Sequence, residues 1–263
     1  MLPEVSRFFA ELGQNLKLFA KYKAIRASKD YLALSQAQRK IIDNEVRDFR
    51  LSGAELPEEK KPRFQAISEE LASLSAKFSE NLLDATNAFA EVVSDEAELA
   101  GLPDDVCQAA REAAEKDGKT GWKFTLLMPS YMPVMQYADS RRLRAALYRA
   151  YATRAAEFGP AELDNTPVIQ RILELRREEA QLLGYNNHAE VSLVPKMAES
   201  VTQVLDFLRD LGAKAKPFAQ KDIEELRQFA KDQLQLDTLE PWDIGYASEK
   251  MLQARYAFSE QEV

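Results

Sequence analysis

Residues 164–200 constrain the fold most, because they contain the start, the apolar face and the end of a helix. They read DNTPVIQRILELRREEAQLLGYNNHAEVSLVPKMAES. Thr166 can cap a helix N-terminus, and Pro167 suits the first helical position, where no backbone N–H is needed. Gly184 falls where a left-handed residue ends a helix. Apolar residues recur between them every three or four positions, which predicts one face made of Ile169, Ile172, Leu173, Ala180 and Leu183.

The same periodicity covers most of the chain. Ser35 and Gln38 form a capping box that predicts a helix running to about Arg50, and Gly53 follows its end. Residues 140–156 predict another helix. An N-terminal helix and a long one after Pro57 are predicted by two apolar stripes: Val5, Phe8, Phe9, Leu12, Leu16 and Phe19, then Phe64, Ile67, Leu71, Leu74, Phe78, Leu82 and Ala85. A stripe of the second kind is typical of helix-on-helix core.

A further long helix is predicted near the C-terminus. Ser200 and Gln203 make a second capping box, and apolar residues continue at helical spacing to Phe229. Pro217 lies inside this run, where it removes a backbone donor and clashes with the preceding turn. We therefore expect Pro217 to kink or divide this helix.

Two short segments favour strands. These are residues 88–93 (AFAEVV) and 122–127 (WKFTLL), which are rich in β-branched and aromatic residues. The second segment has an alternating pattern and is bounded by Gly121 and Pro129. They can pair as an antiparallel ribbon, with a helix over 104–116 between them. The predicted fold class is mainly α, a multi-helix bundle with this small ribbon. We expect one helical segment over 1–263, with a subdivision into 1–160 and 161–263 as the alternative.

Composition excludes several classes of protein. The chain has 46% hydrophobic and 30% charged residues and a net charge of −8, which is typical of a globular protein. Its lysines and arginines are interleaved with acidic residues, so nucleic acid is not an expected partner. No apolar run reaches the length of a membrane span, and no signal peptide opens the chain. The single cysteine fits a reducing compartment. The predicted location is the cytoplasm.

The sequence contains no assembled catalytic motif. A catalytic zinc site needs three protein ligands, and its commonest helical form is H-E-x-x-H, yet His188 is the only histidine. We interpret His188 as a surface or boundary residue at a helix start. A Ser–His–Asp triad stays open, without any local motif to support it. We predict no catalytic residue and no metal ligand in this chain, and its substrate-binding residues stay unknown.

Two other candidate features favour a structural interpretation. Cys107 reads as a small residue on a helix, because its acidic neighbours Asp104, Asp105 and Glu112 should raise the thiol pKa. The acidic pairs at 69–70 and 178–179 are adjacent in sequence, so on a helix their carboxylates diverge by about 100°. We interpret these pairs as solvated faces.

The ends of the sequence suggest a truncated protein. Ser259 and Glu262 form a capping box, which normally announces a helix, one residue before Val263. Residues 2–4 (LPE) likewise read as an entry into the middle of a fold. We expect this chain to be an internal segment of something longer.

Five further blocks follow one another in an order found in one enzyme family. In register with LELRREEAQLLGYNNHAEVSL (173–193), they resemble the thimet oligopeptidase family of zinc metalloendopeptidases, and within it the oligopeptidase A branch. The resemblance covers nearly the whole chain. The blocks are RDFRLSGAELP (47–57), SEELASLSAKFSENLLDAT (68–86), DEAELAGLP (95–103), MPSYMPVMQYADSRRLRAALYRAYATRA (128–155) and EPWDIGYASEKM (240–251). In the last block Ala247 stands where the family often has a second aromatic residue.

The resemblance implies a zinc-dependent, channel-type zincin that hydrolyses short peptides. The family's zinc ligands lie downstream of these blocks and have no matching position here. The resemblance therefore implies that this chain is the helical wall of the substrate channel, inactive by itself, with zinc as the cofactor of the full-length enzyme. An exposed apolar surface and self-association through it would follow.

Two other hypotheses stay open. One is a free-standing, non-catalytic helical module that binds peptides or proteins. The other is a helical scaffold, suggested by the stripe from Phe64 to Ala85.

Overall fold

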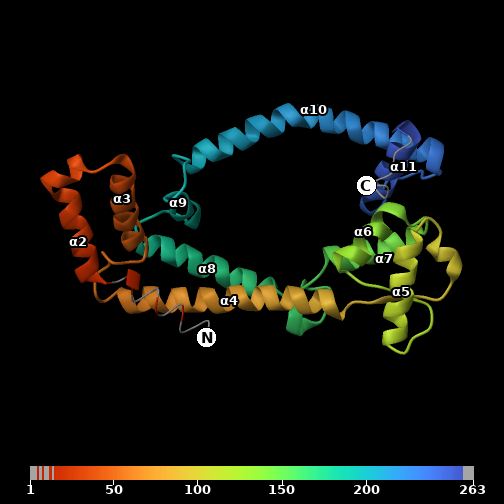
Figure 1. Ribbon diagram of the computed structural model, residues 1–263, viewed down its shortest axis with the longest axis horizontal. Coiled ribbons are helices and arrows are strands. Elements are labelled where there is room, and N and C mark those ends of the chain that lie inside the picture. Colours follow the sequence, from red (N-terminus) through yellow and green to blue (C-terminus); the bar gives the residue numbers. More distant parts are fainter. Residues whose placement is uncertain (1–4, 6–7, 9–11, 14, 257–263) are drawn as a thin grey trace. The chain divides into compact units, whose positions relative to one another are not determined.

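The computed structural model describes residues 5, 8, 12–13 and 15–256, and Figure 1 shows that these form mainly helices. The predicted fold class, mainly α with one two-stranded antiparallel sheet, is confirmed. Phe9, which belongs to the predicted first helix, and the capping box at Ser259 and Glu262 lie outside the described residues. Among the residues described, no helix combines the length and apolar character needed to cross a membrane.

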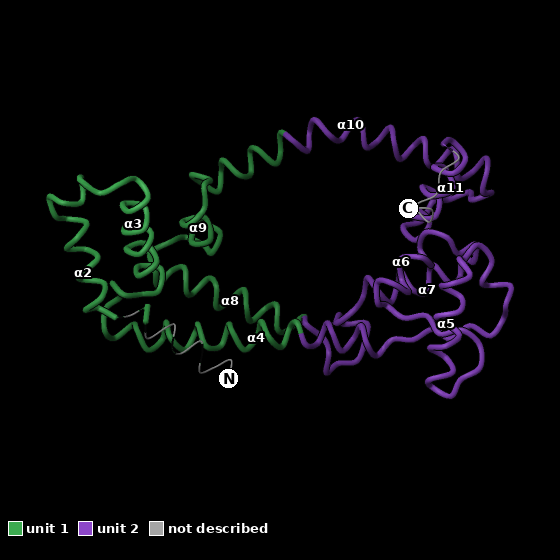
Figure 2. The backbone as a smooth tube through the Cα atoms, in the orientation of Figure 1, with its two compact units in different colours: residues 1–79, 166–210 green, residues 80–165, 211–263 purple. Residues whose placement is uncertain are grey.

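The chain forms two compact units, each made of two separate stretches of sequence (Figure 2). Unit 1 comprises residues 1–79 and 166–210, and unit 2 comprises residues 80–165 and 211–263. Two helices, α4 (Lys61–Ala88) and α10 (Val201–Leu234), begin in unit 1 and end in unit 2. The subdivision of the sequence at 160/161 stays a prediction.

Unit 1 has a small aromatic core between its N-terminal helices. Phe19 and Phe49 stack with their ring centroids 5.2 Å apart, and Val46 and Ala54 complete the buried cluster. On α4, Phe64 and Ile67 are buried at 5% and 0% exposure, as the apolar stripe predicts. The elements confined to this unit are α2 (Leu16–Ala27), η1 (Lys29–Ala33), α3 (Gln36–Leu51), α8 (Thr166–Leu182) and α9 (His188–Leu193).

The predicted helix ends of unit 1 are confirmed at two places. Ser35 and Gln38 form a complete capping box at the start of α3, and Gly53 after that helix has φ +81°. Gly184 after α8 has φ +85°, and the N–H of Tyr185 donates to the carbonyl of Ala180. This bond closes a left-handed helix end that glycine adopts without steric cost.

Two sequence predictions about α8 need correction. The α8 helix begins at Thr166 itself, and two residues of its predicted apolar face, Ile169 and Leu173, are 45% and 59% exposed. The residues of α8 that are buried are Val168, Leu175 and Ala180. Apolar residues occupy a wider arc of α8 than the neighbouring elements cover. Periodicity alone therefore misplaces the buried side of this helix.

The second capping box is incomplete, and Pro217 does not divide its helix. Ser200 Oγ accepts from the N–H of Gln203, but the Gln203 side chain accepts from Glu199 instead of Ser200. The α10 helix continues through Pro217 without a break. A 34-residue helix absorbs the loss of one internal hydrogen bond.

Unit 2 contains the predicted antiparallel ribbon, but both strands are shorter than the predicted 88–93 and 122–127, because α4 continues to Ala88. Strands β1 (Glu91–Val93) and β2 (Trp122–Phe124) pair antiparallel, with Val93 opposite Trp122. The helix α5 (Asp104–Lys116) lies between them in sequence, as predicted. Gly121 precedes β2 with φ +101°, and a Cβ there would collide with the carbonyl oxygen of Val93. Only glycine allows the two strands to approach at this point.

The main core of unit 2 includes Val93, Trp122 and Phe124 of this ribbon. Phe124, Val134, Leu143 and Leu147 are fully buried. Ala247 is also fully buried, in a separate cluster with the last turns of α10. The remaining elements are η2 (Glu96–Leu99), α6 (Met128–Tyr137), α7 (Arg141–Ala152), η3 (Ala161–Leu163), η4 (Pro241–Asp243) and α11 (Ile244–Tyr256).

Candidate functional site

His188 is the first residue of α9, as its position in NNHAE predicts. Asn187 caps this helix by accepting from the N–H of Glu190. His188 Nδ1 is 3.7 Å from Glu179 Oε2, too far for a hydrogen bond. Burial, reinforced by Arg176 and Lys196, lowers the pKa of His188. Burial also raises the pKa of Glu179. Both shifts favour the neutral forms, so this contact is not a strong ion pair.

The chemistry of a zinc site is missing from the residues around His188. Within residues 5, 8, 12–13 and 15–256, no three or more histidine, cysteine, aspartate or glutamate side chains gather so that they could hold a metal ion. A catalytic zinc needs three such ligands. The described residues therefore do not fit a catalytic zinc.

Cys107 lies on α5 beside an open cavity of about 620 Å³ in unit 2. Burial and the carboxylates of Asp104 and Asp105 raise the pKa of its thiol, as predicted. Arg111, on the same cavity wall, stands 5.1 Å from the ring centre of Trp122. A thiol with a raised pKa is a poor nucleophile at neutral pH.

The acidic pairs are not simply solvated faces, contrary to the sequence interpretation. Arg171 holds both carboxylate oxygens of Glu70, at 2.6 and 3.0 Å. Arg63 holds those of Glu178, at 2.6 and 2.5 Å. These two bidentate pairs join α4 to α8 within unit 1 and lower the pKa of both glutamates. The partners are more than 100 positions apart in sequence, so adjacency on one helix could not reveal them.

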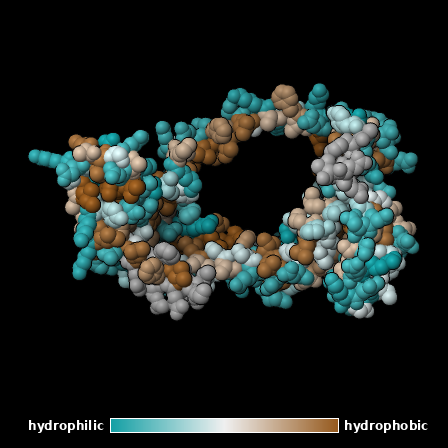
Figure 3. All heavy atoms as spheres, viewed as in Figure 1, coloured by the Kyte–Doolittle hydropathy of each residue, from teal (hydrophilic) through white to brown (hydrophobic). Residues whose placement is uncertain are grey.

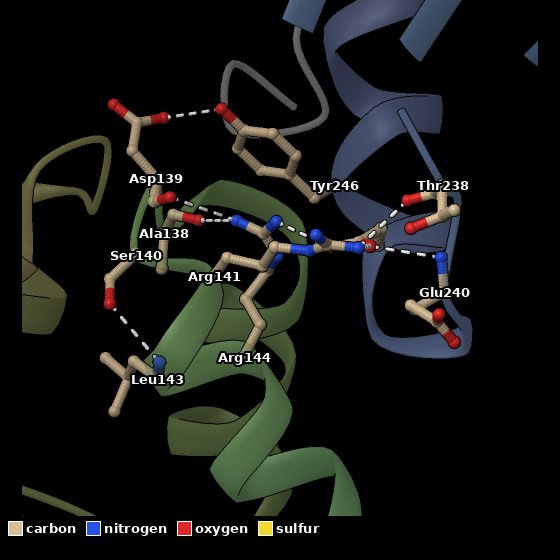
Figure 4. A network of polar contacts seen from close by, with 10 residues as sticks. Ala138, Asp139, Ser140, Arg141, Leu143, Arg144, Thr238, Glu240 and Tyr246 are labelled. Atoms are coloured by element: carbon tan, nitrogen blue, oxygen red, sulfur yellow. Dashed lines mark hydrogen bonds and ion pairs between the residues drawn. The ribbon is translucent and has the colours of Figure 1, made fainter. Parts of the chain in front are cut away.

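The most developed polar site of the described chain is a buried charge network in unit 2 (Figure 4). Asp243, at the end of η4, and Arg144, on α7, are both 0% exposed. Arg144 Nη2 donates to Asp243 Oδ1 over 2.8 Å. Arg144 Nη1 donates to the carbonyl of Ala138 over 2.6 Å. A buried guanidinium is tolerated only with such partners.

A second arginine completes the coordination of Asp243. Arg141 Nη2 donates to Asp243 Oδ2 over 2.7 Å and to the carbonyl of Thr238 over 2.9 Å. The N–H of Glu240 donates to the same carboxylate oxygen. Burial alone would raise the pKa of Asp243, but the hydrogen bonds from Arg141 and Arg144 outweigh it and lower that pKa.

Tyr246 extends the network to the loop before α7. Its hydroxyl donates to Asp139 Oδ1 over 2.8 Å, and the guanidinium of Arg144 lies 4.0 Å from its ring centre (Figure 4). Burial, together with this hydrogen bond, raises the pKa of Tyr246 to about 12. The network thus ties the start of α7 to η4 and α11 with charged and aromatic contacts.

Three other tyrosines of the described chain have different surroundings. Tyr131 and Tyr151 stack with ring centroids 4.3 Å apart in the core of unit 2. Tyr185 lines a cavity of about 440 Å³ in unit 1, together with Lys196 and the first turn of α10.

Comparison with known proteins identifies the family. The family described as "Neurolysin/Thimet oligopeptidase, N-terminal domain" matches residues 1–61, and "Peptidase family M3" matches residues 134–263. The chain is 46% identical over its whole length to oligopeptidase A of Escherichia coli (strain K12) and 45% identical to that of Salmonella typhimurium (strain LT2). It is 41% identical, over 99% of its length, to a probable cytosolic oligopeptidase A of Arabidopsis thaliana. The chain belongs to peptidase family M3.

The M3 match places the charge network inside the family region. Arg141, Arg144, Asp243 and Tyr246 all fall within residues 134–263. The family matches and the oligopeptidase A relatives confirm the resemblance that the sequence blocks indicate. The chain spans 39% of the length of each bacterial oligopeptidase A and 38% of the Arabidopsis relative.

Sequence reasoning missed the network although it had noted both of its segments. SRRLR (140–144) and EPWDIGY (240–246) lie in two of the blocks that resemble the family. The contact between Arg144 and Asp243 spans 99 positions, and a single sequence gives no sign of such a pairing. The one available signal in the sequence is Asp243 itself, a charged residue flanked by the apolar residues Trp242 and Ile244.

Proposed function

We propose that this M3 chain is the helical, non-catalytic wall of the substrate channel in a zinc-dependent oligopeptidase that hydrolyses short peptides. The observation that carries the proposal is the full-length match to oligopeptidase A at 45–46% identity, in which this chain accounts for 39% of the relative. In that reading the remaining part of the enzyme contributes the catalytic groups. Short peptides would be its substrates and the cytoplasm its location, as the name of the cytosolic Arabidopsis relative supports.

Zinc in the full-length enzyme would polarise the scissile carbonyl and activate a water. No step of that reaction is assigned to a residue described in this chain. The role proposed for these helices is to hold an extended peptide in place and to keep bulk water away from it. The Asp243 network would serve that role indirectly, because it fixes η4 and the start of α11 against α7.

The isolated chain is proposed to be inactive. The test is a quenched fluorescent peptide incubated with the purified 263-residue chain in the presence of added zinc, with E. coli oligopeptidase A as the positive control. We expect cleavage by the control only.

A His188→Ala variant serves to recognise contamination. The proposal would be contradicted if the chain cleaved the peptide, a chelator inhibited this cleavage and His188→Ala abolished it. Binding of peptides by a chain whose full-length protein never hydrolyses them would favour the free-standing binding module instead.

A further inference from the structure

The open cavity of about 620 Å³ in unit 2 combines an apolar floor with charged walls. Its floor is made by Leu99, Leu102, Cys107 and Trp122, which belong to the main core of unit 2 or pack against it. In Figure 3 hydrophilic side chains gather over the part of unit 2 that contains α5, so this floor lies within a polar surface. A cavity of this size with an apolar lining and a few polar groups is typical of ligand sites.

Three charged side chains line the cavity, namely Glu96 on η2 and Asp104 and Arg111 on α5. All three are exposed, and none of them forms an ion pair within the part of the chain that the structure describes. Arg111 is held instead over the ring of Trp122, 5.1 Å from its centre. The cavity therefore offers two carboxylates and one guanidinium whose charges are available to a ligand.

The two charged residues of α5 lie at opposite ends of one helix face. Asp104 and Arg111 are separated by about two turns, or roughly 10.5 Å along the helix axis, so both project to the same side. Cys107 and Gln108 lie between them on this face and also line the cavity. A ligand that reaches both charges must therefore be extended and must carry opposite charges at its two ends.

The turn between η2 and α5 is held in one conformation. Gly101 has φ +85°, and a Cβ there would collide with the carbonyl oxygen of Tyr137 at the end of α6. The N–H of Asp139 donates to the carbonyl of Ala100 over 2.8 Å. These contacts fix the wall that η2 forms beside α5, so a ligand does not have to order the backbone of the cavity.

We propose that this cavity binds short zwitterionic peptides of about three residues, with the α-carboxylate at Arg111 and the α-ammonium at Asp104. An extended tripeptide spans about 10 Å, which matches the rise between these two residues. The carboxylates of Asp104 and Glu96 outweigh the positive end of the α5 dipole, about half a charge, so an ammonium group is accepted there. The inference goes beyond the proposed function and does not rest on it, because this binding needs neither zinc nor a catalytic group.

Other classes of ligand fit the cavity less well. A phosphate or another small anion would meet one guanidinium together with two carboxylates. A metal ion would need at least three ligands, and the described residues of this cavity do not supply such a group. A single amino acid carries both charges on one carbon, so it spans too little of the distance from Asp104 to Arg111.

Isothermal titration calorimetry of the 263-residue chain with the peptide alanyl-leucyl-alanine, in the presence of a chelator, measures the binding. The peptide amidated at its C-terminus and the peptide acetylated at its N-terminus should each bind about 5-fold more weakly, because each lacks one charge. Cys107 is the only cysteine and lines the cavity. Its reaction with N-ethylmaleimide should slow as the free peptide saturates the chain, which places the peptide beside α5.

Variants assign each end of the peptide. Arg111→Gln should bind the free and the amidated peptide equally, whereas Arg111→Lys should keep most of the preference for the free carboxylate. Asp104→Asn/Glu96→Gln should remove the preference for the free amine. Asp105→Asn is the matched control and should keep both preferences, because Asp105 is an exposed residue of the same turn that is not among those lining the cavity.

Several results would overturn the inference. One is that alanyl-leucyl-alanine does not bind at millimolar concentrations, or binds without protecting Cys107. Another is that free leucine or a peptide blocked at both ends binds as tightly, or that the Arg111→Gln and Asp104→Asn/Glu96→Gln variants keep the preferences of the parent. Equal protection of Cys107 by inorganic phosphate would show an anion site instead. Tripeptide binding by this chain together with a full-length protein that never cleaves peptides would contradict the proposed function alone.

Discussion

Removal of the Asp243 carboxylate should destabilise unit 2 strongly. Asp243 and Arg144 are both 0% exposed and joined over 2.8 Å, so Asp243→Asn leaves a buried guanidinium without its counter-charge. Breaking a buried pair in this way costs about 3–5 kcal/mol. A domain of this kind has only about 5–15 kcal/mol of stability in total, so the variant should lose a large part of its folding stability.

Urea unfolding followed by tryptophan fluorescence measures this loss in the right place. The two tryptophans, Trp122 and Trp242, both lie in unit 2. Arg141 is the matched control, because its side chain is 40% exposed and solvent screens its charge. Arg141→Gln should cost less than Asp243→Asn, because Arg144 still pairs with the carboxylate. Arg144→Met/Asp243→Leu should recover part of the loss, because it removes both charges together.

The same carboxylate predicts a pH dependence. The folded pKa of Asp243 is lowered, so its contribution to stability is complete above the unfolded value of about 3.9 and is lost as the pH falls through the folded pKa. The Asn variant should lack this acid-dependent component. A loss below about 1 kcal/mol for Asp243→Asn at neutral pH would refute the reasoning.

Three further predictions concern other parts of the chain. Arg171→Ala should lower the thermal midpoint only slightly, and the difference from the parent should vanish at high salt, since this pair is exposed; a salt-independent loss would be contrary to this account. The single histidine, His188, should titrate by NMR below its ordinary pKa near 6.5, and its contribution to stability should be present above that pH and decline as the pH falls through the folded value; a raised pKa would show that Glu179 is an ionised partner. Gly121→Ala should destabilise the ribbon in urea, because its Cβ would meet the carbonyl of Val93, whereas Gly118→Ala, at φ +68° with open space around it, should cost less; equal losses would exclude the collision as the cause.

Local features of the sequence predicted much of the fold. The capping box of Ser35 and Gln38 and the helix end at Gly184 both depend on residues near one another in the chain. Each is governed by backbone geometry that few residue types satisfy. Such features can be read without knowledge of the rest of the molecule.

Features that depend on distant partners could not be read in this way. The pairs Glu70–Arg171 and Arg144–Asp243 join helices about 100 positions apart. Whether Leu173 or Leu175 is the buried leucine of α8 depends on the neighbours that cover the helix. The family was recognisable because its blocks are in order along the chain, and that order needs no tertiary information.

The central claim is that this chain is the non-catalytic part of an M3 oligopeptidase, and the native reading frame beyond the codon for Val263 tests it most directly. The account predicts an in-frame H-E-x-x-H motif further along that frame, since the helices described here would then be joined to a zinc-binding helix. A stop codon directly after Val263 would contradict the account and make the free-standing binding module the leading hypothesis.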